Sequence, residues 1–554
     1  MATILNSRLA KLRALVVDDM QTMRQNIRTQ LGQLGIEKVD QAATPDDVIK
    51  LIRSTSYDVI VCDYNLNRET NGQQLLEFLR SQNMLSPTCM FFMVTAESSY
   101  DSVASAAEFQ PDAYMVKPLT GGRIADRIER LLDKQHALKP INDRLHVKDL
   151  SGAMLECDRI QKTDPRWIID ILKLKSKAAL ELGNLIEARN AYQQALDLRN
   201  DLIWARLGLA RCEQAAGHAD DAKAIVLDVL QKNPQYIDAY DVLAQIAESQ
   251  GKDDEALAAL NNSYEIIPSA RRSRLVGDAA YRAGNLEQAR NAFSKALTHT
   301  RGSLTAQVSD ALSLAQVHVD SGEASLALTV LSEAASASPQ IQQRTQPDAP
   351  DQDNDFALQQ AIIASQAFAA LGDTRSAQAA FASAKELARE LRADATTMAL
   401  AKAAFAVGLD DEGSHIMAKA IRADHENARL VASARKILQD AGKPALIESV
   451  IDATISEATL IVEQATRLMR DGHFDESLAK LEQALDSTPE NTGILLAAAQ
   501  LHLLWMSQKG LDRRYVERVN TYLAQLSKLM PNSERVAKMY RFLRETLVQA
   551  GKKA

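Results

Sequence analysis

The 554-residue chain has little of what marks secreted, membrane-spanning or nucleic-acid-binding proteins. Its four cysteines (Cys62, Cys89, Cys157 and Cys212) are scattered, which excludes a disulfide framework and a metal-binding cysteine pair. No run approaches 18 apolar residues, and residues 1–11 show no cleavable-leader pattern. The net charge of −8 disfavours a nucleic-acid partner, because phosphate binding requires a basic footprint. We therefore expect a soluble, cytoplasmic protein with no nucleic-acid partner and no membrane insertion.

The chain divides into two unlike parts. Up to about Lys134, short Val/Ile-rich runs alternate with helical stretches, a pattern typical of βα units and a parallel sheet. Beyond about Leu150 the strand signal disappears, and alanine, leucine and glutamine recur at helical spacing. In the first part we expect strands near 13–17, 39–42, 58–62, 90–94 and 112–116, and helices near 20–34, 45–54, 72–82, 100–108 and 120–134.

Polar side chains stand at the ends of these predicted strands. Asp18 and Asp19 follow the first strand, Asp63 follows the third, Thr95 the fourth and Lys117 the fifth. Because the carboxyl ends of parallel strands meet at one crevice, we expect these side chains to lie together. Three neighbouring carboxylates require a cation or a shared proton, and Mg²⁺ prefers such ligands and also binds phosphoryl oxygens. A carboxylate can attack phosphorus, so the crevice is predicted to accept a phosphoryl group as an aspartyl phosphate.

These residues, in this order and spacing, closely resemble the receiver domain of bacterial two-component response regulators over about residues 12–134. The resemblance implies a flavodoxin-like fold with a five-stranded, doubly wound parallel sheet. It implies that Asp63 is the phosphoacceptor and that the donor is a sensor histidine kinase or a phosphotransfer protein. It also implies that Asp63, Asp19 and the backbone carbonyl of Asn65 bind Mg²⁺ directly, while Asp18 acts largely through water.

The same resemblance assigns roles to the other strand ends. Thr95 and Lys117 would be the catalytic partners of Asp63, and Lys117–Pro118 would be a cis peptide bond. Thr95 and Tyr114 would form the switch, although Tyr114 also fits a half-buried strand residue. The alternative for the whole pocket is a degenerate receiver kept for binding alone, but no pocket residue is missing.

Two further residues bear on the lifetime of the phosphoryl group. Asn65 and Glu97, each two residues past a pocket residue, resemble the chemotaxis-type pairing. That resemblance implies a labile phosphoryl group.

The second part of the chain repeats at a nearly fixed interval. Gly183, Gly217, Gly251 and Gly284 are separated by 34, 34 and 33 residues, and an alanine follows each glycine by five residues. A glycine that ends one helix and a small residue where two helices cross describe a helix hairpin. The phase returns, less regularly, around Gly322, Gly372, Gly408 and Gly472. This pattern resembles the tetratricopeptide repeat, which implies an α-helical solenoid with a protein-binding concave face; an irregular bundle with chance glycines is the alternative.

We expect six regions along the chain. They are a receiver domain at 12–134, a polar connector with Pro140 at 135–147, a solenoid with an N-terminal cap helix at 148–340, an acidic flexible loop at 341–355, a degenerate solenoid at 356–500 and C-terminal capping helices at 501–554.

The sequence shows no DNA-binding or catalytic output. It has no basic recognition helix, no Gly-rich phosphate loop, no Gly-x-Ser-x-Gly and no His/Glu metal spacing. We therefore predict a phosphorylation-controlled adaptor or scaffold that is no enzyme beyond self-phosphorylation and autodephosphorylation at Asp63. The alternatives are a transcriptional regulator and a phosphatase-type effector that acts through an unrecognised C-terminal element.

Two features predict how the solenoid binds and how it is switched. Lys173 and Lys177, four residues apart, and Arg211 in the next repeat would clamp an acidic peptide in the groove, unless they are a solvated face. Phosphorylation would act through Thr95 and Tyr114 on the 100–134 face, which either docks on the early repeats or forms a homodimer.

Overall fold

The computed structural model of the chain describes residues 8–66, 70–86, 88–95, 111–300, 306–344, 350–388, 394–425, 427–510, 513–529, 535–536 and 538–543. Two compact units make up the chain. One comprises residues 1–317 and 332–349, and the other comprises residues 318–331 and 350–554.

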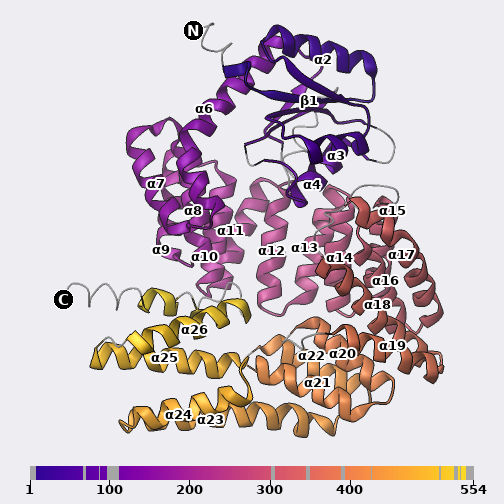
Figure 1. The fold of residues 1–554 in the computed structure, drawn as a ribbon, viewed down its shortest axis with the longest axis vertical. Helices are drawn as coiled ribbons and strands as arrows, with labels where there is room; N and C mark the ends of the chain where they lie inside the picture. Colours follow the sequence, from indigo (N-terminus) through magenta and orange to yellow (C-terminus); the bar gives the residue numbers. More distant parts are fainter. Residues whose placement is uncertain are drawn as a thin grey trace. The chain divides into compact units, whose positions relative to one another are not determined.

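The first unit begins with a sheet of five parallel strands in the order β2-β1-β3-β4-β5 (Figure 1). Its strands are β1 (Arg13–Val17), β2 (Lys38–Ala42), β3 (Val59–Asp63), β4 (Met90–Thr95) and β5 (Ala113–Val116). Successive side chains alternate between two apolar clusters, with Val16 and Phe92 in one and Leu15 and Phe91 in the other. A parallel sheet with an apolar core on each face confirms the predicted doubly wound α/β class.

Helices α2 (Gln21–Gln33), α3 (Pro45–Ser54) and α4 (Gly72–Ser81) connect these strands, and local sequence explains where they begin. The Thr44 side chain accepts a hydrogen bond from the Asp47 amide at 3.2 Å, so Thr44 caps α3 just before Pro45. The helix predicted near 100–108 lies outside the described residues.

Helix α6 (Gly121–His146) differs from the prediction, because it runs through the region where we expected a connector. Leu138, Ile141 and Leu145 recur at helical spacing, and they pack in one cluster with residues of the next two helices. This burial stabilises the helix although Pro140 lacks the amide hydrogen that would bond to the preceding turn. Residues 135–146 are therefore the second half of one 26-residue helix.

All regular elements described beyond α6 are helices. In the first unit they are α7 (Leu150–Thr163), a 3₁₀ turn (Pro165–Trp167), α8 (Ile168–Glu181), α9 (Leu185–Leu198), α10 (Ile203–Ala215), α11 (Ala219–Lys232), α12 (Ile237–Ser249), α13 (Asp253–Ile266), α14 (Ala270–Arg282) and α15 (Leu286–Thr300). Helix α7 lies at the start of the predicted 148–340 region, where we expect the N-terminal cap helix. From α8 to α15 the helices stack in sequence as hairpins (Figure 1). None of the helices in the described ranges combines the length and apolar character required to cross a bilayer.

The predicted repeat glycines all end helices in the left-handed backbone conformation. Their φ angles lie between +69° and +87° at Gly183, Gly217, Gly251, Gly284, Gly322, Gly372, Gly408 and Gly472, and Gly442 shares the conformation at +70°. The alanines five residues after the first four of these glycines are fully buried where helices cross. The helix-hairpin prediction is therefore confirmed at both of its diagnostic positions.

Helices α16 (Val308–Asp320) and α17 (Ala324–Arg344) contain residues of both units. The second unit continues with α18 (Pro350–Ala370), α19 (Thr374–Leu387), α20 (Ala395–Ala406), α21 (Asp410–Ala423), α22 (Ala428–Asp440), a π-helical segment (Ile447–Asp452), α23 (Ala453–Arg470), α24 (Phe474–Ser487), α25 (Thr492–Lys509) and α26 (Arg513–Leu529).

The acidic loop predicted at 341–355 is wrong at both ends. Helix α17 continues to Arg344 and α18 begins at Pro350, while residues 345–349 lie outside the described part of the chain. Proline favours the first position of a helix, and aspartates are stabilised in the first turn by the helix dipole. The same residues that predicted a loop therefore start a helix.

We predict that Gly217→Ala lowers the free energy of unfolding by about 1 kcal/mol, because alanine is strained at positive φ. An added Cβ meets nothing within 4 Å at this glycine, so the cost comes from the backbone alone. Urea unfolding followed by circular dichroism measures the change.

Gly32→Ala in α2 is the matched control, since its added Cβ also meets nothing within 4 Å but its backbone is helical. That variant should gain about 0.4–1 kcal/mol. Equal effects of the two substitutions would contradict the backbone explanation.

Candidate functional site

The carboxyl edge of the sheet brings together the side chains that the sequence places at strand ends. One carboxylate oxygen from each of Asp18, Asp19 and Asp63 lies within 4.8 Å of the other two. The amino group of Lys117 lies 3.1 Å from Oδ2 of Asp63 and 3.5 Å from Oδ2 of Asp18. Thr95, which is buried, ends β4 one residue past Val94, the register partner of Asp63. The predicted convergence is therefore present.

Backbone contacts fix the acidic residues after β1. Oδ1 of Asp18 accepts a hydrogen bond from the Met20 amide at 2.8 Å. The Arg24 guanidinium donates to the carbonyl oxygens of Asp18 and Asp19 at 2.7 and 3.0 Å. Arg24 therefore holds the turn that carries both carboxylates, a role that the sequence analysis did not predict.

The charges in this pocket are out of balance. Burial raises the pKa of Asp63 above its usual value, Lys117 offsets part of this effect, and the charge of Asp18 adds to it. Burial works against the charge on Lys117, but the hydrogen bond and charge of Asp63, with the charge of Asp18, raise its pKa. Three carboxylates beside one ammonium leave a negative site.

The donor set fits a hard divalent cation. Carboxylate oxygens this close together are the ligands that Mg²⁺ prefers, and their excess negative charge would be compensated by the ion. Asp18 and Asp63 are almost fully buried while Asp19 is exposed, so the site has one side open to solvent.

Helix α4 begins against the backbone of Asp63. The Gly72 amide donates to the Tyr64 carbonyl at 2.7 Å, and a Cβ on Gly72 would lie 2.3 Å from the carbonyl oxygen of Asp63. The Asn71 side chain caps the helix by accepting a hydrogen bond from the Gln74 amide at 2.8 Å. Gly72 was also missed by the sequence analysis, although the capping sequence around Asn71 marks the helix start.

The other residues predicted for the receiver pocket have mixed outcomes. The Lys117–Pro118 peptide bond is cis, as predicted. Tyr114 is half-buried on β5, and its hydroxyl donates to Oε1 of Gln73 at 3.4 Å. Asn65 is exposed after β3, while Glu97 lies outside the described residues. The switch role of Tyr114 and the metal-binding role of the Asn65 carbonyl stay predictions.

The three cations predicted for the solenoid groove lie on α8 and α10. Lys173 is placed 5.7 Å above the Trp204 ring, and burial, followed by the charge of Lys134, lowers its pKa. Arg211 lies close enough to Asp238 for its charge to oppose the burial that raises the pKa of that carboxyl. Lys177 contributes to the positive charge around Lys173. Acidic side chains also lie near these cations, and the charge of Asp238 interacts with the charges of both Lys173 and Arg211.

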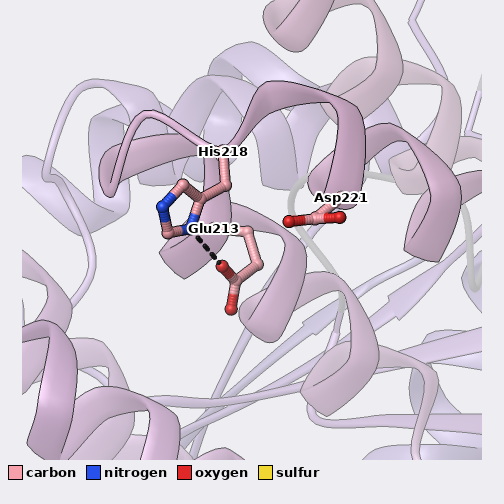
Figure 2. A group of neighbouring side chains, drawn as sticks. All are labelled: Glu213, His218 and Asp221. Carbon is pink, nitrogen blue, oxygen red and sulfur yellow. Dashed lines mark hydrogen bonds and ion pairs between the residues drawn. The ribbon is translucent and has the colours of Figure 1, made fainter.

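A second group of acidic side chains, with a histidine, lies at the turn between α10 and α11 (Figure 2). Nδ1 of His218 lies 3.0 Å from Oε2 of Glu213, and Arg189 donates to the other carboxylate oxygen at 2.5 Å. Asp221, the third member, is exposed. Glu213 already contacts both Arg189 and His218, so this cluster stabilises the turn around Gly217. We therefore assign it no metal.

We predict that Gly72→Ala weakens Mg²⁺ binding and lowers the free energy of unfolding by about 1–3 kcal/mol, because the new Cβ forces α4 or the Asp63 backbone to move. Calorimetric titration with Mg²⁺ and urea unfolding measure the two effects. Gly122→Ala in α6 is the control, since its Cβ meets nothing within 4 Å. Wild-type Mg²⁺ affinity in Gly72→Ala would contradict the geometry.

Comparisons with known proteins agree with this division of the chain. Residues 14–129 match the response regulator receiver domain family, and residues 179–246 and 462–504 match tetratricopeptide repeat families. Chemotaxis protein CheY of Pseudomonas aeruginosa is 31% identical over 123 residues, which are 22% of this chain and 98% of that protein. Chemotaxis protein CheY-3 of Vibrio cholerae is 26% identical over 134 residues, 24% of this chain and 99% of that protein.

Solved structures resemble parts of the helical region. A thermophilic tetratricopeptide repeat protein of Thermus thermophilus is 18% identical, covers 32% of this chain and 98% of its own, and has a TM-score of 0.27. A tetratricopeptide repeat protein of Parabacteroides merdae is 14% identical, covers 46% of this chain and 92% of its own, and has a TM-score of 0.31.

Proposed function

We propose that phosphorylation of Asp63 controls which proteins the helical repeats of this chain bind. The chain belongs to the response regulator family through its receiver domain, and it also carries tetratricopeptide repeats. A receiver domain is the mark of a two-component response regulator, and tetratricopeptide repeats mediate protein–protein interaction. The phosphoryl donor would be a sensor histidine kinase or a phosphotransfer protein.

The observation that carries this proposal is the contact of the Asp63 carboxylate with Lys117 in a group that also holds the carboxylates of Asp18 and Asp19. A carboxylate oxygen of Asp63 would attack the phosphorus, and the bond between phosphorus and the donor nitrogen would break. Lys117 would stabilise the negative charge on the phosphoryl oxygens, and the Thr95 hydroxyl would donate a hydrogen bond to one of them. Bound Mg²⁺ would supply the remaining positive charge.

The repeats would provide the output by binding a protein partner. Lys173, Lys177 and Arg211 lie on two neighbouring helices and would attract an acidic segment of that partner. This adaptor role requires no turnover of a separate substrate, so the only reactions we assign are the gain and loss of the phosphoryl group at Asp63. We place the protein in the cytoplasm, where its phosphoryl donor would act.

Helix α6 would transmit the change from the receiver to the repeats. Its first half contributes Ile124 and Ile128 to the core on one face of the sheet. Its second half contributes Leu138 and Ile141 to the cluster that includes Ile171 of α8. Since one helix is buried in both clusters, a displacement at the receiver alters the packing of the first repeat directly.

An ion pair at the middle of α6 strengthens this connection. The amino group of Lys134 donates to Oδ1 of Asp170 on α8 at 2.5 Å. Beyond the effect of burial, the charges of both residues act on the pKa of Lys173, which lies one turn further along α8. Movement of α6 would therefore change the electrostatics beside Trp204 as well as the packing. A coupling of about 1–3 kcal/mol would be sufficient for a useful change in affinity.

We predict that acetyl phosphate with Mg²⁺ adds one phosphoryl group, which hydroxylamine removes. Intact-protein mass spectrometry measures the gain, and peptide mapping locates it at residue 63. Asp63→Asn should show no gain, and removal of Mg²⁺ with a chelator should slow the reaction. The absence of modification in the wild-type chain would rule out the proposal.

We also predict that beryllofluoride, a mimic of the phosphoryl group, changes the tryptophan fluorescence in the presence of Mg²⁺. The chain has three tryptophans, all outside the receiver, and Trp167 packs in the cluster that α6 shares with α7 and α8. Trp167→Phe should lose most of the change, whereas Trp505→Phe should retain it. A change that persists in Trp167→Phe and is lost in Trp505→Phe would contradict transmission through α6.

A further inference from the structure

A small pocket lies among α13, α14 and α15, away from the receiver. Its volume is about 80 Å³. None of the described side chains that line it is acidic. The polar ones are Asn261 and Tyr264 of α13, Ser273 of α14, and Gln288, Asn291 and Lys295 of α15.

A buried hydroxyl of this pocket lacks a hydrogen-bond partner among the described residues, and an exposed cation that lines the same pocket forms no ion pair with them. Ser273 is 1% exposed, and its hydroxyl has no hydrogen-bond partner. The Lys295 amino group lies 5.1 Å above the Tyr264 ring and forms no ion pair with any residue in the described ranges. A buried hydroxyl without a partner is destabilising, so a ligand that accepts its hydrogen bond would be stabilised here.

An earlier repeat shows what this pocket lacks. A groove among α9, α10 and α11 is lined by residues at the same repeat positions. In the earlier groove, Arg206 lies eleven residues before Gly217 and Asp228 eleven residues after it. The later pocket has Ser273 and Lys295 at the same distances before and after Gly284.

In the earlier groove the side chains at these two positions carry opposite charges that compensate each other, but in the later pocket they do not. Arg206 pairs with Asp228 at 3.2 Å and also donates to the Asn200 carbonyl at 3.0 Å. In the later pocket a hydroxyl replaces the guanidinium and an ammonium replaces the carboxylate. The later pocket therefore has its cation at the position of the earlier carboxylate, and no carboxylate among the described lining residues faces it.

We propose that this pocket binds a carboxylate group, supplied either by a small free carboxylate or by an acidic side chain of a protein. Lys295 would provide the charge, while the Ser273 hydroxyl and the Asn291 amide would donate hydrogen bonds. A single cation matches a monoanion. A cavity holds a water from about 10–15 Å³, so this pocket admits a carboxylate on a short stem but no nucleotide.

The test uses the full-length, unphosphorylated chain, so its result is independent of Asp63. One probe is acetate, with acetamide as its neutral control. The other probe is an acetylated, amidated Gly-Glu-Gly peptide, with Gly-Gln-Gly as its control. Saturation-transfer NMR at millimolar concentration measures binding. An affinity for the peptide at least about tenfold above that for acetate assigns the ligand to a protein, and comparable affinities assign it to a free carboxylate.

Matched variants locate the site. Lys295→Gln should weaken binding of both probes by at least about tenfold, and Ser273→Ala should weaken it by a smaller factor. Ser273→Asp supplies the missing carboxylate within the chain, so it should abolish binding and raise the melting temperature. Lys50→Gln, which removes an exposed charge on α3, should change nothing. No binding of either probe to the wild-type chain, or wild-type affinity in Lys295→Gln, would overturn the proposal.

Discussion

The burial of one helix in two apolar clusters is the constraint on which the organisation of the first unit depends. Ile124 and Ile128 require α6 to lie against the sheet, while Leu138 and Ile141 require the same helix to lie against α7 and α8. An unbroken helix transmits a rotation or a shift along its length, whereas a loop would absorb it. A receiver domain and a repeat array that could act independently are thereby joined through a shared structural element.

The receiver pocket illustrates how parallel strands concentrate charge. Four of the five strands (β1, β3, β4 and β5) carry one or two polar residues at the end of the apolar run, and parallel pairing brings the side chains that follow β1, β3 and β5 close together. The outcome is a group of carboxylates held beside one lysine, with a raised pKa at Asp63 because of burial. A site with unbalanced negative charge favours a divalent cation.

In the solenoid, the residues at equivalent positions of different repeats can be compared directly. Because the glycines place equivalent residues at equivalent positions, a change of side chain between repeats can be read as a change of chemistry. The pair Arg206 and Asp228 is complete within the chain, and Ser273 with Lys295 is not. Arg274 and Asp310 form another ion pair, nearly buried, which joins α14 to α16. Removing one of the two side chains would be destabilising, because the other charge would stay buried without its partner.

The sequence by itself determined the elements that depend on local pattern. Strand ends with polar residues, capped helix starts and glycines at a 34-residue interval are local features, and they located the sheet, the pocket and the helix hairpins. It did not determine where α6 and α18 begin and end, since Pro140 and the aspartates after Pro350 also fit loops. Only tertiary packing decided that α6 continues through Pro140, because its apolar side chains Leu138, Ile141 and Leu145 gain stability only when α7 and α8 are in place. The tertiary structure also decided two features that no local pattern marks: the start of α4 at Gly72 lies against the backbone of Asp63, and Lys295 forms no ion pair with any residue in the described ranges.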